Sequence, residues 1–297
     1  MKVLKFGGTS VGSVEGLNNI KQIVNDNADS LIVVVSALSG VTNTLVEMTR
    51  LAASHDAGYE AMLPALVKRH EDIINVVVPR EGRLSCMRVV NTFVNESLSN
   101  SLGVLMANTE LSDELYEAVS DAIVSHGEIL SSAIVSLMLK NSKPHFAPAF
   151  IHTTDENGSR IVDWASTEKH VIKEFAGDMT RVHVVQGFIA ADSQTGVKTT
   201  LGRGGSDYTA AILAAILQAD SLEIWTDVDG FYDSDPRTNP DARLIERMTY
   251  EQAQRLCDNG AKVIYPPTIA PVAMRGIDVW VKNTFNPTAP GTLITGK

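Results

Sequence analysis

Apolar residues along the chain form short continuous runs that alternate with longer stretches of helical periodicity. The runs are rich in valine and isoleucine, and each is short enough to be one strand. Continuous apolar runs of this kind predict strands of a parallel sheet that is covered on both faces. The predicted strands are Val3–Phe6, Leu31–Val35, Val182–Ile189, Leu222–Trp225 and Asp278–Val281.

Helical spacing of apolar positions occupies the stretches between these runs. Alternation of strands and helices predicts a layered α/β fold with right-handed crossovers. Gly58–Leu111 has helical periodicity, more charge and few strand signals, so we expect a helical insertion there that covers one edge of the sheet. The predicted helices are Val14–Asn25, Thr42–Ala53, Ser112–Ser125, Ser132–Lys140, Asp207–Ala219 and Thr249–Asp258.

The composition is that of an ordinary globular protein. Of the 297 residues, 44% are hydrophobic and 20% are charged, and this length allows one large or two moderate domains. The net charge of -10 argues against a general binder of nucleic acid or membrane surfaces. An anionic ligand would therefore need a locally positive pocket, which gives weight to the basic residues beside glycine-rich turns.

Cysteine usage and the N-terminus predict a cytoplasmic protein. Cys86 and Cys257 have neither the spacing of a zinc site nor that of a disulfide framework, so we expect two reduced, buried thiols. No secretory signal pattern is present, and the longest apolar run, Ala210–Leu217, is too short to span a bilayer. The seven histidines follow no ligand or triad spacing, so we expect structural or surface roles for them and predict no metal ligands.

A glycine-rich turn that leads into an apolar helix is the most informative segment. Gly202, Gly204 and Gly205 allow close approach of the backbone to a ligand. Ser206 and Asp207 stand where a helix N-cap is expected, and a helix N-terminus attracts anions. Because Arg203 adds a guanidinium group suited to carboxylate or phosphate, the turn predicts a site for a small anion.

A second glycine turn, Gly7-Gly8, follows the first predicted strand and comes directly after Lys5 and Phe6. Its lysine precedes the glycines, unlike the order in a P-loop. A lysine and backbone amides can nevertheless surround transferring phosphate oxygens. Both glycine turns lie at ends of predicted strands, where ligands gather in α/β folds.

Hydroxyl and carboxylate groups follow in two further segments. Ser36 and Thr42 come after a predicted strand and can bond a polar ligand, although ordinary turn roles stay open for them. Glu128 lies on an apolar helical stretch, where a buried carboxylate needs a cation. A structural salt bridge and contact with a substrate ammonium group are both open for Glu128.

The aspartate-rich segment 225–237 suits a nucleotide better than calcium, because it lacks the glutamate of an EF-hand. Thr226 and Asp227 can bond base or ribose, Tyr232 can pack on the base, and Arg237 can reach phosphates; an ordinary turn also stays open. Lys262 precedes a proline-started helix and would either neutralise phosphates or lie on the surface.

In this order, the motifs resemble the catalytic domain of aspartate kinases in the amino acid kinase family. The matching segments cover the chain from end to end. They are KFGGTSVG from Lys5, VVSALSGVTNTL from Val34, GEILSS from Gly127, TTLGRGGSDYTAA from Thr199, WTDVDGFYDSDPR from Trp225, GAKVIYPPTI from Gly260 and NPTAPGTLI from Asn286.

The resemblance implies a three-layer αβα sandwich with a central, mostly parallel sheet. It implies one kinase domain over 1–297, with an aspartate-binding lobe at about 1–195 and an ATP-binding lobe at about 196–297. The implied reaction uses ATP and Mg²⁺ to phosphorylate the β-carboxylate of L-aspartate, the first step of lysine, threonine and methionine biosynthesis. Relatives usually continue into ACT regulatory domains, which we do not expect here; a homodimer or a linked regulatory or dehydrogenase region stays open.

The resemblance also implies roles for particular residues. The implied catalytic residues are Lys5, Gly8, Asp207 and Lys262, with Asp207 orienting the lysines. Aspartate would contact Ser36, Thr42, Glu128, Arg203 and Ser206. The nucleotide would contact Lys5, Gly7, Gly8, Thr226, Asp227, Val228, Tyr232, Arg237, Lys262 and Val263. Tyr265 is a departure, because many relatives carry histidine there.

The residue types fit this substrate independently of the resemblance. Arg203 suits an α-carboxylate and Glu128 an ammonium group, whereas an N-acetylated substrate would leave Glu128 without a cation. A substrate carboxylate is already ionised at pH 7, so no general base is needed. A glutamate-type kinase and a non-catalytic amino-acid-binding module stay open, while the glycine spacing disfavours a Rossmann dehydrogenase.

Overall fold

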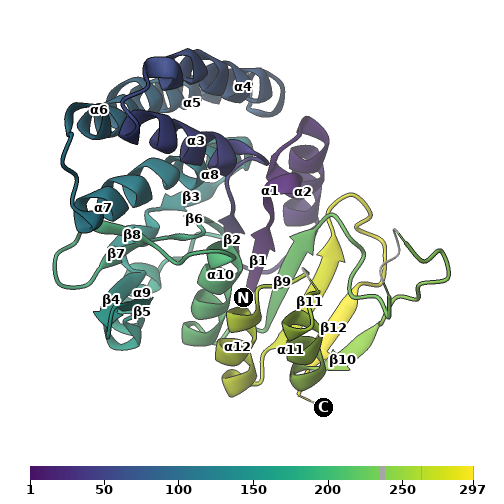
Figure 1. Ribbon diagram of the computed structural model, residues 1–297. Coiled ribbons are helices and arrows are strands. Elements are labelled where there is room, and N and C mark those ends of the chain that lie inside the picture. Colours follow the sequence, from purple (N-terminus) through teal and green to yellow (C-terminus); the bar gives the residue numbers. More distant parts are fainter. Residues whose placement is uncertain (235–237, 262, 297) are drawn as a thin grey trace.

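An eight-stranded sheet forms the centre of the molecule, and helices cover both of its faces (Figure 1). The computed structural model describes residues 1–234, 238–261 and 263–296. The strand order is β10-β12-β11-β9-β1-β2-β6-β3, and β12 is antiparallel to β11 whereas the pairs from β11 through to β3 are parallel. This confirms the expected αβα sandwich. The strands are β1 (Lys2–Phe6), β2 (Leu31–Val35), β3 (Ser142–His145), β6 (Val182–Gln186), β9 (Ser221–Thr226), β10 (Arg247–Thr249), β11 (Asp278–Asn283) and β12 (Thr292–Thr295).

Successive residues of the central strands point into two different cores. On β1, Leu4 and Phe6 pack into one core, while Val3 packs into the other. Side chains alternate between the faces of a strand, so Lys5 lies on the same face as Val3. Burial on both faces explains why β2 is apolar without interruption, whereas β1 carries Lys5 among its apolar residues.

The two helical layers come from different parts of the chain. The first core contains side chains of α1 (Gly8–Val11), α2 (Val14–Asp26), α3 (Val41–Ala53), α7 (Asp113–Val124) and α8 (His126–Met138). The second contains side chains of α9 (Trp164–Phe175), α10 (Gly205–Ile216), α11 (Tyr250–Asp258) and α12 (Ile269–Arg275). Cys86 and Cys257 are buried and unpaired, as expected. No helix in the described ranges has the length and apolar character needed to cross a membrane.

The segment Gly58–Leu111 is helical, but its predicted place at a sheet edge is wrong. It contains α4 (Met62–Val77), α5 (Arg80–Thr92), a π-helical segment (Phe93–Leu98) and α6 (Ser99–Ala107). These helices pack on α2, α3, α7 and α8, which separate them from the sheet (Figure 1). The insertion therefore extends the first core outward.

The predicted strand Val182–Ile189 is two strands in two different sheets. β6 ends at Gln186, and β7 (Ile189–Asp192) belongs to a small four-stranded sheet with order β5-β4-β7-β8. Between them, a Cβ on Gly187 would lie 2.5 Å from the Cβ of Ser206, and Phe188 has a φ of +70°. The turn is therefore fixed by close packing against α10. The other members are β4 (His152–Glu156), β5 (Ser159–Val162) and β8 (Lys198–Thr200).

Candidate active site

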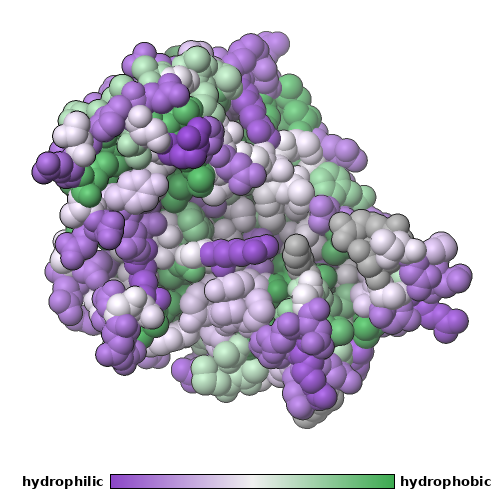
Figure 2. All heavy atoms as spheres, in the orientation of Figure 1, coloured by the Kyte–Doolittle hydropathy of each residue, from purple (hydrophilic) through white to green (hydrophobic). Residues whose placement is uncertain are grey.

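A polar cleft of about 530 Å³ opens at the carboxyl ends of β1, β2 and β9. Figure 2 shows this face hollowed between the helices α3 to α6 and the helices α10 and α12. The two glycine turns lie in this one cleft. Its lining includes these predicted site residues: Lys5, Gly7, Gly8, Ser36, Thr42, Glu128, Arg203, Ser206, Asp207, Thr226 and Val263.

Lys5 and Asp207 form an almost buried ion pair at the floor of the cleft. Lys5 Nζ lies 2.7 Å from Asp207 Oδ1, and each side chain is 11% exposed. The pair forms because Lys5 lies on the face of β1 that α10 covers. The other carboxylate oxygen, Oδ2, accepts a hydrogen bond of 3.2 Å from the backbone N–H of Tyr265. Asp207 thus fixes the ammonium group of Lys5 and also holds the segment around Tyr265 against α10.

The N-cap of α10 is Gly204, so the expected cap positions at Ser206 and Asp207 are wrong. Gly204 has a φ of +72°, and the helix begins at Gly205. Ser206 and Asp207 therefore lie in the first turn, where backbone N–H groups lack intrahelical acceptors. A Cβ on Gly204 would lie 2.2 Å from Cγ of Tyr265. The ring of Tyr265 therefore packs directly on this turn.

A Gly204→Ala variant is expected to be markedly less stable than a Gly202→Ala variant. Both glycines have positive φ angles, +72° and +70°, so alanine strains the backbone at each by about 1–2 kcal/mol. The new Cβ has open space at Gly202 but meets Tyr265 at Gly204, which adds roughly 1–3 kcal/mol of overpacking. Urea unfolding of both variants measures the difference; equal losses would show that the contact with Tyr265 relaxes freely.

Glu128 lies in the first turn of α8 and is 4% exposed. Its Oε1 accepts a hydrogen bond of 3.0 Å from the N–H of Ala37, and its buried Oε2 has no hydrogen-bond partner among the described residues. Burial raises the pKa of Glu128 to about 8, although the backbone hydrogen bonds and Lys5 act in the opposite direction. No ion pair to Glu128 is present within the described ranges, so the structure does not support a structural salt bridge there.

The loop after β2 is held on three sides. Ser131 Oγ donates to the carbonyl of Ser36 at 2.7 Å, and Arg69 of α4 donates to the carbonyl of Ser39. The N–H of Ser39 donates to the carbonyl of Gly8 at 3.0 Å. A Cβ on Gly8 would lie 3.0 Å from the carbonyl oxygen of Ala37, which explains the glycine. Hydrogen bonds therefore join the Gly7-Gly8 turn and the loop after β2 along one side of the cleft.

Some cationic and amide groups of the cleft have no hydrogen-bond partner among the described residues. Arg203 is exposed and forms no hydrogen bond or ion pair with another described residue. Gly8 begins α1, so its N–H lacks an intrahelical acceptor, whereas the N–H of Gly7 donates to the carbonyl of Trp225 at 3.0 Å. Gly7 therefore contributes space rather than a free amide.

Only some of the residues that were predicted to bind the nucleotide line the cleft. Thr226 and Val263 line the cleft, whereas Asp227, Val228 and Tyr232 do not belong to its lining. The hydroxyl of Tyr232 donates to Asp229, which also accepts hydrogen bonds from Asn283 and Asn286. This aspartate-rich loop is thereby tied to the end of β11. Arg237 and Lys262 lie outside the described residues.

A match to a family model over most of the chain decides the sequence family. The model of the amino acid kinase family matches residues 1–283. The chain belongs to the amino acid kinase family. Lysine-sensitive aspartokinase 3 of Escherichia coli is 33% identical to this chain, over 99% of the chain and 64% of its own length. A bifunctional aspartokinase/homoserine dehydrogenase 2 of Arabidopsis thaliana is 34% identical over 98% of the chain, which covers 32% of that protein.

Solved structures agree with this placement. Escherichia coli aspartokinase III in complex with aspartate and ADP superimposes with a TM-score of 0.86 at 31% identity, and the match covers all of this chain and 65% of that chain. The chain thus spans between about a third and about two thirds of the length of these relatives.

Several residues that line the cleft were not singled out from the sequence. They are Thr9, Ala37, Leu38, Asn43 and Phe188. Thr9, Ala37, Leu38 and Asn43 lie in segments whose neighbours were predicted to bind ligand, so those motifs already contained the signal. Phe188 was missed because the sequence predicted it to lie within the strand Val182–Ile189. Its positive φ and the hydrogen bond from its N–H to Thr209 Oγ1, at 3.1 Å, turn it toward α10 and the cleft.

Proposed function

We propose that this chain transfers the γ-phosphoryl group of ATP to the β-carboxylate of L-aspartate, producing 4-phospho-L-aspartate and ADP. The observation that carries the proposal is the buried oxygen of Glu128, which lacks a partner in a cleft that also contains Lys5 and Arg203. An unpaired buried carboxylate needs a cation, and an amino-acid ammonium group supplies one. Relatives described as aspartokinases, one of them in complex with aspartate and ADP, support the same substrates.

The cleft suits a small amino acid with two carboxylates. The ammonium group would bond Glu128, and one carboxylate would bond the exposed guanidinium of Arg203. The hydroxyls of Ser36, Thr42 and Ser206 line the same space and would complete the contacts. An N-acetylated substrate would leave Glu128 unpaired, so free aspartate fits better.

The reaction needs positioning and charge neutralisation. An oxygen of the β-carboxylate attacks the γ-phosphorus in line, a new O–P bond forms, and the bond to the β-phosphate oxygen breaks to release ADP. The attacking carboxylate is already ionised, so no residue must remove a proton. Lys5, held by Asp207, and the amide of Gly8 would stabilise charge on the transferring oxygens. We assign Lys262 a supporting role at the phosphates.

The nucleotide would enter beside Thr226 and Val263, which line the cleft. Asp227, Val228, Tyr232 and Arg237 are proposed as further nucleotide contacts. Mg²⁺ would arrive with the phosphates and neutralise their charge. Both carboxylates of the cleft would have other partners: Asp207 bonds Lys5 and Tyr265, and the free oxygen of Glu128 would bond the substrate ammonium group. The cleft therefore fits a Mg²⁺ ion whose ligands come mainly from phosphates and water. Mg²⁺ commonly retains water and phosphate ligands rather than a cage of protein carboxylates.

We further propose that the chain is the catalytic domain of an enzyme that carries out the first step of lysine, threonine and methionine biosynthesis. Its lobes at about 1–195 and 196–297 would bind aspartate and nucleotide, respectively. The relatives named above include a lysine-sensitive enzyme and a bifunctional dehydrogenase, which supports a linked regulatory or dehydrogenase region as partner. A homodimer is the other partner that we propose. We place the activity in the cytoplasm, although the plant relatives are chloroplastic.

A hydroxylamine trap tests the proposal. The chain is incubated with ATP, Mg²⁺ and aspartate, glutamate or N-acetylglutamate, and hydroxamate and ADP are both measured. We expect aspartate to produce stoichiometric hydroxamate and ADP at the highest kcat/KM of the three. A preference for glutamate would replace the assigned substrate, whereas binding of aspartate and ATP without ADP release would support a non-catalytic binding module.

A further inference from the structure

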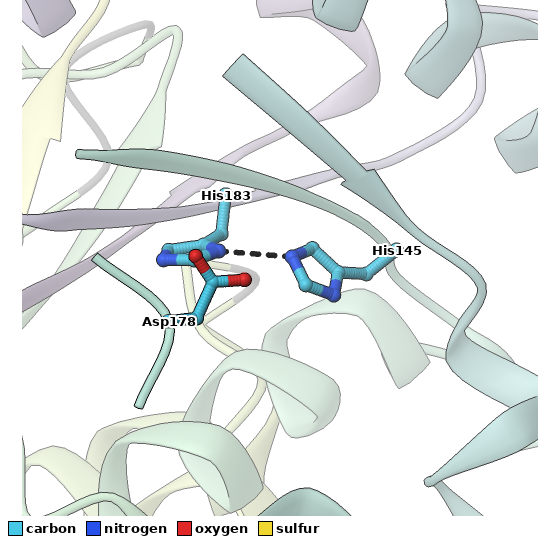
Figure 3. A group of neighbouring side chains, drawn as sticks. All are labelled: His145, Asp178 and His183. Carbon is cyan, nitrogen blue, oxygen red and sulfur yellow. Dashed lines mark hydrogen bonds between the residues drawn. The ribbon is translucent and has the colours of Figure 1, made fainter. Parts of the chain in front are cut away.

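Two histidines and an aspartate meet at an edge of the central sheet, outside the cleft (Figure 3). His145 ends the edge strand β3, His183 lies on β6, and Asp178 follows α9. The potential ligand atoms of the three side chains all lie within 4.8 Å of one another. Lys143 on β3 is directly opposite His183, so His145 is the diagonal neighbour of His183 on the same face.

A carboxylate fixes the proton on His145. Its Nδ1 lies 2.7 Å from Oε1 of Glu174, and a carboxylate accepts, so Nδ1 carries the hydrogen. The lone pair of Nε2 then points toward Nδ1 of His183, 2.9 Å away. Metal-bound histidines are typically held in this way, by donation of their second N–H to a carboxylate.

The surroundings make the cluster rigid and largely dry. The side chain of His145 is fully buried, and the ring of Phe175 stacks on it at 4.7 Å between centroids. Phe150 approaches the same imidazole edge-on at 6.5 Å. Access is from the side of Asp178, which is 13% exposed, and Lys143, which is 47% exposed. An apolar shell with one polar entrance limits the access of water to the cluster.

We propose that His145, His183 and Asp178 form a binding site for a divalent cation of the Zn²⁺ class. Because Nε2 of His145 accepts, Nδ1 of His183 donates the hydrogen bond between the rings, and cation binding would move this proton to Nε2 of His183. Two imidazole nitrogens and one carboxylate oxygen would then fill three tetrahedral positions, and water the fourth. Metal–nitrogen bonds of about 2.0–2.1 Å place two such nitrogens roughly 3.3 Å apart. The two imidazoles must therefore separate by about 0.4 Å from their present 2.9 Å, which small side-chain rotations provide.

Lys143 competes with the cation for Asp178. Its Nζ lies 2.6 Å from Asp178 Oδ2, while Oδ1 accepts a hydrogen bond from the N–H of Thr180. A bound cation would replace the ammonium group of Lys143, which can move into solvent. Removal of Lys143 is therefore expected to strengthen binding, an effect that a purely structural pair of histidines does not produce.

Titration of the full chain with Zn²⁺ by calorimetry, and with Co²⁺ by visible absorption, tests the site. We expect one ion per chain with a tetrahedral Co²⁺ spectrum. His183→Gln and Asp178→Asn should each weaken binding more than tenfold, and Glu174→Ala roughly 10–100-fold. Lys143→Gln should bind more tightly. The matched control is His170→Gln, because the ring of His170 on α9 contacts His152 and not this cluster.

Each contrary result overturns the site. Absence of stoichiometric binding removes it, and binding that is lost in His170→Gln but retained in His183→Gln assigns the ion to the other histidine pair. Unchanged affinity in Lys143→Gln eliminates Asp178 as a ligand. Circular dichroism of each variant checks folding, and Asp178→Asn decides the test if His183→Gln does not fold, because Asp178 lies outside the strands.

Discussion

A Lys5→Met variant is expected to lose roughly 10²–10³-fold in kcat for phosphoryl transfer, by comparison with removal of one oxyanion donor. Lys5 lines the cleft with its ammonium group fixed 2.7 Å from Asp207. Methionine keeps most of the side-chain volume but removes the charge that would neutralise the transferring phosphate. The measurement is single-turnover formation of ADP and acyl phosphate with aspartate.

Two control variants separate chemistry from folding. Lys5→Met also leaves the carboxylate of Asp207 buried without its cation, which costs about 3–5 kcal/mol of stability. The double variant Lys5→Met/Asp207→Asn removes that unpaired charge, so it should regain stability but remain inactive. Lys2→Met on the same strand, where Lys2 pairs with Asp29 at the surface, should turn over within about twofold of the unchanged chain. Near-normal turnover in Lys5→Met would remove Lys5 from the mechanism.

A Glu128→Gln variant is expected to bind aspartate roughly 10–100-fold more weakly, while its affinity for nucleotide stays the same. The reason is loss of a charge-assisted hydrogen bond to the substrate ammonium group, worth about 1.5–3 kcal/mol. Isothermal titration with each ligand separates the two affinities. Glu15→Gln is the matched control, because Glu15 also lies in the first turn of a helix but is exposed. Equal weakening for aspartate and nucleotide would contradict a specific ammonium contact.

The raised pKa of Glu128 makes this binding pH-dependent. With a pKa near 8, the free protein holds Glu128 largely protonated at pH 7, whereas the substrate ammonium group favours the carboxylate. Affinity for aspartate should therefore rise from about pH 6 to pH 8, with proton release on binding, and then level off. Glu128→Gln should abolish this rise. A pH-independent affinity in the unchanged chain would assign the ammonium contact elsewhere.

The same shift predicts a pH-dependent stability. The folded pKa of Glu128 lies above its usual value of 4.5, so the unfolded chain releases this proton first as pH rises. The contribution to the free energy of unfolding is full below about pH 4.5 and falls as pH rises toward 8. Glu128→Gln lacks this slope. By linkage, its free energy of unfolding near pH 8 should exceed that of the unchanged chain by about a few kcal/mol. Urea unfolding at pH 5 and pH 8 measures it.

Local patterns in the sequence determined the central strands and the chemistry at their ends. β1 and β2 place apolar side chains in both cores because each of their faces is covered, so their continuous apolar runs predicted a buried parallel sheet. β9 and β11 send Leu222, Ile224, Val279 and Val281 into the second core. Local sequence also predicted that Lys5 and the Gly202–Gly205 turn belong to an anion-binding site. Glycines beside basic residues, at the point where a strand leads into a helix N-terminus, suit the close approach of an anion.

Tertiary contacts decided what local periodicity does not contain. Val182–Ile189 is one apolar run, yet it divides into two sheets because Gly187 packs against Ser206. Glu128 could be assigned neither a salt bridge nor a free oxygen until its neighbours were known. His145 and His183 follow no sequence spacing, since parallel strands join residues that are distant in the chain. Propensity and periodicity describe neighbours along the chain, whereas pairing, capping and burial depend on residues that only folding brings together.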